Sequence, residues 1–445
     1  MKLNQKITVL VGLAFLSISA FWQMYDNVIP LMLKGTFHLD EALTGAVMAA
    51  DNILALFLLP FFGALSDRTS TRIGRRMPFI LGGTAAAVVL MNLLPVLDNR
   101  YAAAPSPGTR AAFVVLLGLL LVAMGTYRSP AVALMPDVTV KPLRSKGNAV
   151  INLMGAVGGV LYLIAAAVLY SDERVGGLAH VDYRLLFAIV SGIMVLSVLT
   201  LFCTVREPDL AAQAARYEAA HPEEDLTEAA AGSGRAALPP PVRRSLLFLL
   251  LSIALWYIAY NAVTTWLTTY VREQMGRALG GASTCLMVAT AGAIVSYIPI
   301  GEISSRIGRK RTILGGVALL SLCFAAGYVL TALYAEINGV MYAVFALVGL
   351  AWAAINVNSL PMVVEMCKGS DVGKFTGYYY TASMTAQVIT PVLAGSLMKH
   401  ISYQVLFPYA AFFVGMSFVT MLFVRHGDSK ADVKTGLDAF EDMDD

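Results

Sequence analysis

Charged side chains are scarce in this sequence. Asp, Glu, Lys and Arg make up 14% of the 445 residues, while 58% of the residues are hydrophobic. Soluble proteins carry about a quarter of charged residues, so this composition excludes an ordinary soluble fold. The small net charge of +3 comes from basic residues spread along the chain, and we expect no nucleic-acid partner. The expected surroundings are a lipid bilayer.

Cysteine and histidine are also few, at four and five residues. The cysteines lie within or at the ends of apolar segments, and their spacing fits neither a metal site nor a disulfide framework. The histidines are scattered in loops or near segment ends. We therefore expect cysteines that serve packing, no metal site, no cofactor and no enzyme activity.

Long apolar runs are abundant. A helix needs about 20 apolar residues to cross a bilayer, and windows of that length predict twelve transmembrane helices in an all-α membrane protein. They cover residues 7–33, 43–65, 79–97, 111–135, 147–170, 185–205, 245–271, 282–303, 312–334, 339–362, 375–398 and 403–424. The first run has Gln23, Asp26 and Asn27 in its middle and no small-residue cleavage pattern after it, so we expect a helix rather than a removed signal peptide.

A short basic string occurs twice. Arg-Ile-Gly-Arg-Arg at 72–76 returns as Arg-Ile-Gly-Arg-Lys at 306–310, 234 positions later, and each copy follows the second apolar segment of its half. The same offset relates two further pairs, Trp22 with Trp256 and Asn27 with Asn261. A shared offset indicates an internal repeat, and such repeats are typical of alternating-access transporters. We expect two pseudo-symmetric six-helix bundles.

The apolar pattern stops between the two halves. An acidic run, a Gly-Ser-Gly stretch and three consecutive prolines replace it, which is typical of a linker. The expected organisation is a bundle at 1–205, a cytoplasmic linker at 206–243 with a short amphipathic helix near 210–220, a bundle at 244–425 and an acidic tail at 426–445.

Lys and Arg are more numerous in the connections after the even-numbered segments than in those after the odd-numbered ones. Because basic loops stay on the cytoplasmic side, both termini are expected in the cytoplasm of a plasma (inner) membrane protein. We expect a monomer.

The connection after the second segment carries a recognisable motif. It reads Gly63, then Asp67-Arg68, then Gly74-Arg75-Arg76. This arrangement resembles the motif of the major facilitator superfamily. The Thr-Ser-Thr-Arg spacer, and the later stretch from Arg128-Ser-Pro to Pro-Asp137, are similar to the glycoside-pentoside-hexuronide and sucrose-transporter-like group. The resemblance spans residues 7 to 425 and implies the major facilitator fold and secondary transport by alternating access.

The motif predicts a cytoplasmic gate. Carboxylates and arginines at helix ends can pair when the cytoplasmic side is closed. The residues expected in this gate are Asp67, Arg68, Arg75, Arg76, Asp137, Arg309 and Glu365. Fixing membrane topology is the alternative role of these arginines. The second copy has Ser305 where Asp67 would be, so we expect a weaker gate there.

Ionisable residues inside the apolar segments predict a proton pathway, because such groups are costly in a membrane. Asp26 and Asp51 fall at similar depth in two antiparallel segments, and a close pair of carboxylates would hold one proton. Arg128 needs a partner, with Asp26, Asp51 and Asp137 as candidates. The resemblance implies that Asp137 takes part in proton coupling, whereas its position suggests a gate residue; both readings stay open.

Sodium coupling is disfavoured. Melibiose-type carriers, which the group includes, have two aspartates on the inner half of the second helix, where this chain has Ala55 and Leu59. A sodium ion needs several fixed oxygen ligands, so the proton is the expected coupling ion.

Polar and aromatic residues within the segments predict the solute site. Sugars present hydroxyl groups and apolar C–H faces, which amides, carboxylates and aromatic rings suit. The candidates are Trp22, Tyr25, Asp26, Asn27, Asn52, Asn148, Asn152, Trp256, Tyr260, Asn261, Asn356, Asn358, Tyr378 and Gln387. Interfacial belts and helix packing are the alternative roles for about half of them.

The expected function is proton-coupled symport of a sugar or glycoside. Two alternatives stay open: proton-coupled export of drugs or other small solutes, and a membrane sensor that does not transport. A site lined mainly by Phe and Met would favour the exporter. A sensor usually needs a sizeable soluble domain, and this chain has a linker and a short tail.

Overall fold

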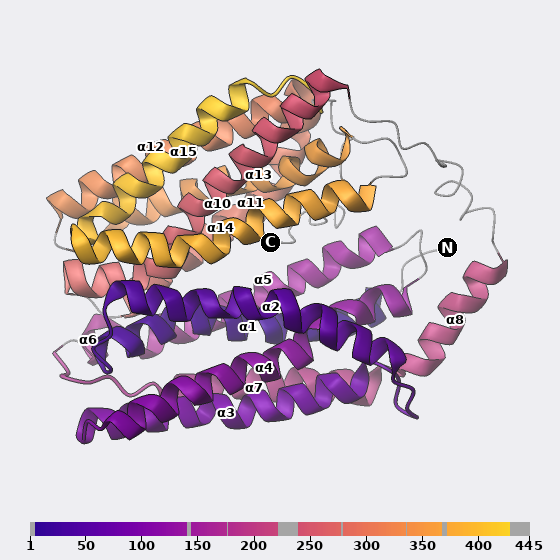
Figure 1. Cartoon of the computed structure of the whole chain (residues 1–445), viewed down its shortest axis with the longest axis horizontal. Helices are drawn as coiled ribbons and strands as arrows, with labels where there is room; N and C mark the ends of the chain where they lie inside the picture. The colour runs from indigo at the N-terminus through magenta and orange to yellow at the C-terminus, as the bar shows by residue number, and fades with distance from the viewer. Residues whose placement is uncertain are drawn as a thin grey trace. The chain divides into compact units, whose positions relative to one another are not determined.

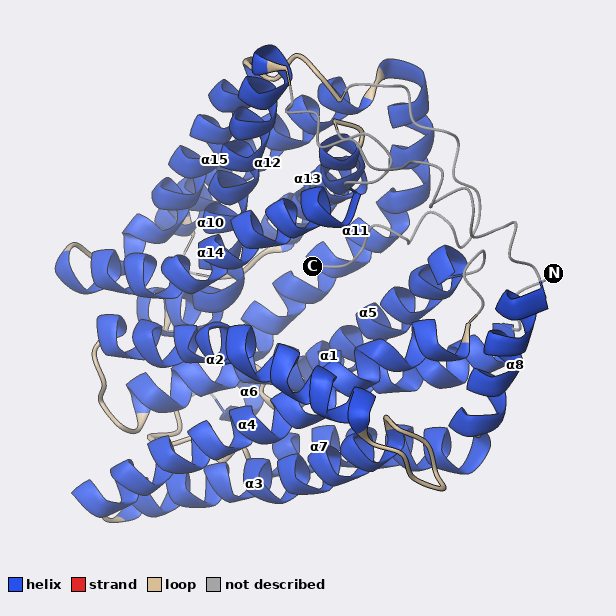
Figure 2. Ribbon diagram, turned by 45° about the vertical axis from the view of Figure 1, so that its right-hand side comes forward, coloured by secondary structure: helices blue, strands red, loops and turns tan. Residues whose placement is uncertain are grey.

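The computed structural model describes residues 5–139, 144–175, 177–220, 239–276, 279–334, 336–366 and 372–427. Every regular element in these ranges is a helix (Figure 2). The expectation of an all-α membrane protein is confirmed.

The described residues of the first half of the chain form eight helices. They are α1 (Gln5–Gly35), α2 (Glu41–Arg68), α3 (Met77–Ala103), α4 (Pro107–Val138), α5 (Arg144–Leu169), α6 (Asp172–Val175), α7 (Arg184–Thr204) and α8 (Glu207–Ala220). Ser106 caps the N-terminus of α4, because its side chain accepts a hydrogen bond from the Thr109 N–H at 3.1 Å. Pro107 occupies the first turn, a position that proline favours.

The part of the second half that the structure describes forms six α-helices and a short 3₁₀ turn. They are α10 (Pro240–Met275), α11 (Leu279–Ile307), α12 (Arg309–Leu333), α13 (Gly339–Val364), α14 (Val372–His400), η4 (Tyr403–Val405) and α15 (Leu406–Leu422). Asn338 caps α13 by accepting from the Val340 and Met341 N–H groups, both at 3.1 Å. Gly276 ends α10 in the left-handed conformation that glycine favours.

Eleven helices of the described residues are long and apolar enough to cross a membrane, one fewer than the twelve expected. The segment expected at 375–398 lies in α14, a helix of 29 residues that is not among the eleven. It carries three consecutive tyrosines with Thr381, Ser383 and Gln387, and these polar groups lower its hydropathy. The helix is nevertheless long enough to span a bilayer.

The chain divides into two compact units. Unit 1 contains Met1–Asp40, Ala50–His221 and Ala278–Gly280, and unit 2 contains Glu41–Ala49, Pro222–Arg277 and Gly281–Asp445. Figure 1 colours the helices of the first half from indigo to magenta and those of the second from red to yellow.

In unit 1, α1 packs against α5 and α7, and α3 packs against α4 and α7. The approach of α1 to α5 depends on Gly158, because a Cβ at this position would collide with the Leu16 carbonyl. In unit 2, α10 packs against α14 and α15, and α12 packs against α13 and α15.

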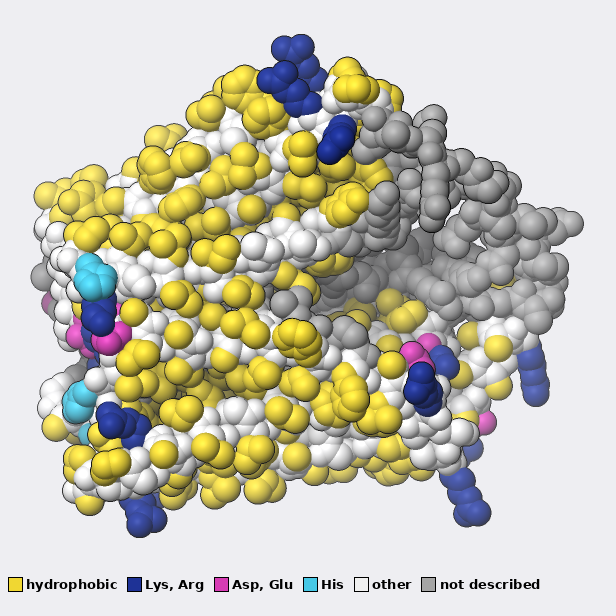
Figure 3. Space-filling view, viewed as in Figure 1, with side chains coloured by type: hydrophobic (Ala, Val, Ile, Leu, Met, Phe, Trp, Pro, Cys, Tyr) yellow, Lys and Arg dark blue, Asp and Glu magenta, His cyan; other side chains and the backbone are white. Residues whose placement is uncertain are grey.

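Large apolar side chains cover the outer faces of the helices. Phe57, Phe61, Val295 and Leu322 are each at least 60% exposed, which would be unfavourable in water but suits contact with lipid. Figure 3 shows hydrophobic side chains over the sides of the helices, with Lys and Arg near helix ends.

Candidate functional site

Asp26 of α1, Asp51 of α2 and Arg128 of α4 interact electrostatically inside unit 1, and we call them the charged triad. The Arg128 guanidinium lies over the Trp22 ring, 5.7 Å from its centroid, within the range of a cation–π interaction. Asn52 Nδ2 donates a hydrogen bond to Asp51 Oδ1 at 2.8 Å. Of the three candidate partners of Arg128, the structure brings Asp26 and Asp51 to it and leaves Asp137 elsewhere.

Several buried polar atoms of unit 1 have no hydrogen-bond partner among the described residues. They are Trp22 Nε1, Tyr25 OH, Asn152 Nδ2 and Tyr162 OH. Tyr25 and Tyr162 also interact electrostatically with Asp26. Because an unsatisfied buried polar group is unfavourable, such atoms are suited to contact a polar solute or water. Tyr162 does not stand out in the sequence, since it lies among the apolar residues of α5.

Two other candidates of unit 1 differ from this pattern. Asn27 is fully buried, and its Nδ2 donates to the Gln23 carbonyl on the same helix at 2.6 Å. The side chain of Asn148 lies outside the described part of the chain.

Unit 2 contains an aromatic cluster. The Tyr260 and Trp352 rings are stacked, with centroids 3.6 Å apart and planes within 5° of parallel. Tyr257 meets the same Trp352 ring edge-on at 5.4 Å, and its hydroxyl lies 3.1 Å from the Tyr379 hydroxyl. The sequence pattern does not single out Trp352, because it sits in an uninterrupted apolar stretch. Its position on Tyr260 becomes apparent only in the folded bundle.

Unit 2 also has buried polar atoms without a partner among the described residues. Trp256 Nε1, Asn261 Nδ2 and Asn356 Oδ1 are of this kind. Asn358 differs, because its Nδ2 donates to the Ala354 carbonyl at 2.9 Å and its Oδ1 accepts from Ser304. Asn358 therefore joins α13 to α11.

The remaining two candidates lie on α14. Tyr378 is 39% exposed, with its ring 5.8 Å from that of Phe375. Gln387 is half-buried.

Four residues of unit 1 that we expect in the gate meet at the end of α4, and we call them the gate cluster: Asp67, Arg75, Arg76 and Asp137. Arg75 Nη2 lies 2.6 Å from Asp137 Oδ1, and Arg76 Nε lies 2.8 Å from Asp137 Oδ2. Arg76 also pairs with Asp67 and donates to Ser66. Asp137 is nine residues beyond Arg128 on α4, or about 13 Å along the helix axis. It belongs to the gate cluster in this structure, and Arg68 lies exposed at the end of α2 outside these ion pairs.

Arg76 is held in its charged form. Burial acts to lower its pKa, but the hydrogen bonds and negative charges of Asp137 and Asp67 outweigh burial and raise the pKa above its ordinary value. The side chain is only 5% exposed, so the two carboxylates replace the water that a free guanidinium would bind.

Glu207 completes this cluster from α8. Its carboxylate accepts hydrogen bonds from three consecutive backbone N–H groups, those of Arg75 at 2.8 Å, Arg76 at 2.9 Å and Met77 at 2.9 Å. These N–H groups stand at the N-terminus of α3. The carboxylate therefore accepts from donors that have no partner within the helix, and its negative charge interacts favourably with the positive end of the helix dipole. Glu207 is 2% exposed. Helix α8 begins at this residue, three positions before the helix expected near 210–220.

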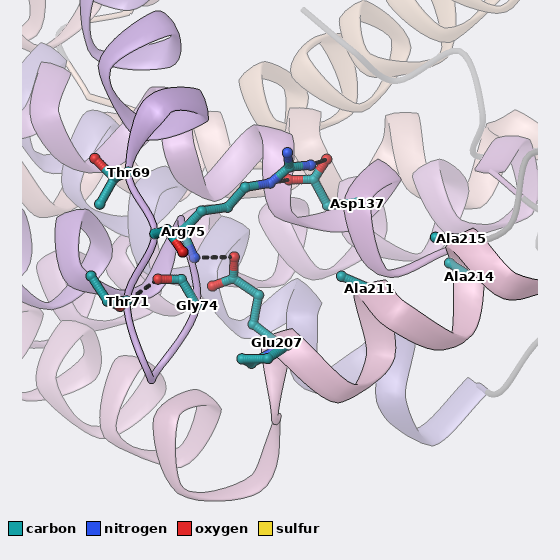
Figure 4. Close-up of a pocket in the computed structure, with 11 residues that line it drawn as sticks. Thr69, Thr71, Gly74, Arg75, Asp137, Glu207, Ala211, Ala214 and Ala215 are labelled. Atoms are coloured by element: carbon teal, nitrogen blue, oxygen red, sulfur yellow. Dashed lines mark hydrogen bonds and ion pairs between the residues drawn. The ribbon is translucent and has the colours of Figure 1, made fainter.

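A cavity of about 460 Å³ lies beside this cluster (Figure 4). Its walls are the connection from Thr69 to Arg75, Asp137 and the alanine face of α8. Gly74 adopts a φ of 117°, and a Cβ there would collide with the Glu207 carboxylate.

The second copy of the basic string has a related geometry. Gly308 also has a positive φ, of 94°, and the next residue, Arg309, forms an ion pair with Glu365. Arg309 stands at the position of Arg75 in the repeat. The side chain of Ser305 is outside the described part of the chain.

A comparison with protein families identifies the family of this chain. The family model described as the Major Facilitator Superfamily matches residues 11–333 and 278–439. The sucrose transport protein SUC3 of Arabidopsis thaliana is 32% identical over 144 residues, which cover 30% of this chain and 24% of the relative. The proton-associated sugar transporter A of Rattus norvegicus is 27% identical over 187 residues, covering 41% of this chain and 24% of the relative. Each match spans about a quarter of the relative's length.

A solved structure extends the likeness to the whole fold. A bacterial homologue of the iron transporter ferroportin superposes with a TM-score of 0.66, covering 95% of this chain and 99% of that chain. At 12% identity this likeness concerns the fold alone.

Proposed function

This chain belongs to the Major Facilitator Superfamily of secondary transporters, and from that premise we propose that it carries a sugar or glycoside together with a proton. It is an integral membrane protein that moves a small solute and is not an enzyme. The observation that carries the proposal is the charged triad inside the membrane-spanning helices of unit 1.

The triad supplies the proton site. Two carboxylates and one guanidinium leave a formal charge of −1, and binding of one proton makes the group neutral. An uncompensated charge within a bilayer is unfavourable, so the protonated triad is the form suited to the conformational change. Trp22, Tyr25 and Asn152 extend from the same unit and can sense the solute beside the proton.

The aromatic and amide groups of unit 2 support a sugar as the solute. The Tyr260 and Trp352 rings offer apolar faces, while Trp256, Asn261 and Asn356 offer hydrogen-bonding atoms. The relatives named for sucrose and proton-associated sugar transport support the same solute class. A drug exporter would favour a lining of Phe and Met, so the polar atoms count against that alternative.

The gate cluster sets the orientation in this proposal. Arg75, Arg76, Asp137 and Glu207 lie at the cytoplasmic end of unit 1, and both termini lie in the cytoplasm of the plasma (inner) membrane. The bundles extend over residues 1–205 and 244–425, and they alternate access to the solute as a monomer.

Uptake into proteoliposomes tests the proposal. Labelled monosaccharides and disaccharides are offered under an imposed pH gradient, an imposed sodium gradient or neither, and we expect accumulation of at least one sugar with the pH gradient alone. Failure of both gradients to drive any sugar would overturn the symporter. Gradient-driven loss of a preloaded amphipathic drug would instead identify an exporter.

Two variants locate the proton site. Asp26→Asn and Asp51→Asn should each reduce gradient-driven accumulation about tenfold or more, while sugar exchange at equal pH persists. In either variant the triad keeps one carboxylate and one guanidinium, so it is neutral without a proton and the pH gradient no longer drives transport. Asp137→Asn is the matched control and should keep the coupling. Loss of coupling in Asp137→Asn, with coupling retained in the other two variants, would move the proton site to the end of α4.

A further inference from the structure

A second cluster of charges lies at the opposite end of unit 1. His180, in the segment before α7, places its Nε2 2.7 Å from Asn99 Oδ1 and 3.5 Å from Asp98 Oδ2. Asp98 and Asn99 belong to the last turns of α3, far from the gate cluster at its first turn. Helices α6 and α8 mark these two ends of the unit in Figure 1.

The burial of the two partners is unequal. Asp98 is fully buried, whereas the His180 side chain is 29% exposed and can exchange a proton with water. A buried carboxylate is strongly stabilised by a charged partner and poorly by a neutral one. The charge of His180 therefore decides how firmly its segment is held on α3.

Several other ionisable groups face His180. The cluster contains Asp98 of α3, Tyr170 at the end of α5, and Asp182, Tyr183 and Arg184 leading into α7. Burial raises the pKa of Tyr170 to about 12.

Asp182 stays ionised throughout the physiological range. Burial pushes its pKa up, but hydrogen bonds from Arg184 and Asn99 and the charge of Arg184 bring the pKa down to about 2. A histidine side chain ordinarily titrates near pH 6.5, and His180 is partly exposed to water, so its charge is suited to respond around neutral pH.

The segment is connected to a further contact of unit 1. The Tyr170 hydroxyl donates to the Asp182 carbonyl at 2.9 Å, and the Tyr170 carbonyl accepts from the Gly280 N–H at 2.8 Å. A Cβ at Gly280 would collide with the Tyr170 backbone, so the two lie in close contact. Loosening residues 177–183 would therefore loosen the position of Tyr170 against Gly280.

We propose that His180 and Asp98 form an acid-responsive clasp, which holds residues 177–183 on α3 when His180 is protonated and loosens when it is neutral. This clasp is separate from the charged triad, because its residues lie on α3 and in the segment before α7 rather than on α1, α2 and α4. The clasp lies at the end of unit 1 opposite the gate cluster, and placing that end at the outer side of the membrane rests on the proposed function.

Hydrogen exchange of the backbone amides tests the clasp without measuring transport. His180→Gln keeps a hydrogen-bond donor and removes the titratable charge. At pH 5.5 we expect the amides of residues 177–183 to exchange about fivefold faster in this variant than in the wild type, and at pH 8 we expect equal rates. His38→Asn is the matched control, because His38 is an exposed histidine in the connection between α1 and α2.

Further variants separate the clasp from a folding defect. Asp98→Asn, which also removes the ion pair, should abolish the pH-dependent difference, and His180→Lys should keep the segment protected at pH 8. Equal exchange of wild type and His180→Gln at pH 5.5, or the same increase at both pH values, would overturn the proposal. The clasp and the proposed transport function can fail separately. Equal hydrogen exchange with intact pH-driven uptake would overturn the clasp alone, and pH-dependent protection without pH-driven uptake would overturn the transport function alone.

Discussion

At the scale of single residues, Glu207 has a demanding position beside the gate cluster. One carboxylate accepts from three successive backbone donors, and it does so almost completely shielded from water. It thereby fixes the start of α3, from which Arg75 and Arg76 reach Asp137. Helix α8 is in this way attached to the residues that we propose as the cytoplasmic gate.

Glu207→Gln should lower the free energy of unfolding by about 2 kcal/mol, because hydrogen bonds to a charged acceptor are replaced by weaker ones and an amide N–H group faces other donors. Thermal unfolding in detergent, followed by intrinsic fluorescence, measures the change. Asp209→Asn is the control, as it removes an exposed carboxylate from the same helix turn. Equal midpoints for the two variants would contradict the role of Glu207.

The sequence predicts some of these residues better than others. Asp26 and Asp51 stand out because an ionisable residue in an apolar run is rare, and their similar depth follows from antiparallel helices. Glu207 does not stand out, because its partners lie more than 100 residues earlier in the chain. Trp352 is hidden for a related reason, since stacking on Tyr260 depends on how two helices of unit 2 pack.

At the scale of helices, the close contact of α1 with α5 is highly sensitive to side-chain size. Lipid surrounds the outer faces, so the helices of a bundle gain little from the hydrophobic effect and depend on close packing. Gly158 permits this packing, with the Leu16 carbonyl directly opposite.

Gly158→Leu should therefore destabilise unit 1 by about 3 kcal/mol, because the added side chain must push α1 away from α5. Gly118→Leu on α4 is the matched control, since a Cβ there meets nothing within 4 Å. Both variants can be compared by thermal unfolding and by size-exclusion profile after extraction. An unaltered thermal unfolding midpoint in Gly158→Leu would show that α1 and α5 can move apart without a loss of stability.

Helix positions follow well from the sequence, because bilayer thickness fixes the length of an apolar run. All twelve expected segments overlap helices, from α1 to α15. The exceptions have physical causes: α14 is too polar to count as a span by hydropathy, and α6, of four residues, is too short to leave a periodic pattern. The start of α8 is set by the tertiary contact of Glu207.

At the scale of the whole molecule, the distribution of basic residues predicts which face is cytoplasmic. Single cysteines at Ser70 and Leu178, in a variant without the native cysteines, mark the two ends of unit 1, and both positions are exposed. In intact cells an impermeant maleimide should label Leu178→Cys at least about tenfold faster than Ser70→Cys, until the membrane is permeabilised. The opposite labelling pattern would reverse the orientation.

The charged triad also has an electrical consequence. Under the proposed coupling, the empty carrier bears a charge of −1 within the membrane spans, and the carrier loaded with a proton and a neutral sugar bears none. Moving one elementary charge across a membrane voltage of 100 mV changes its free energy by about 2.3 kcal/mol. The voltage therefore drives the return of the empty carrier, and a negative interior would speed this return by repelling the triad toward the outer face.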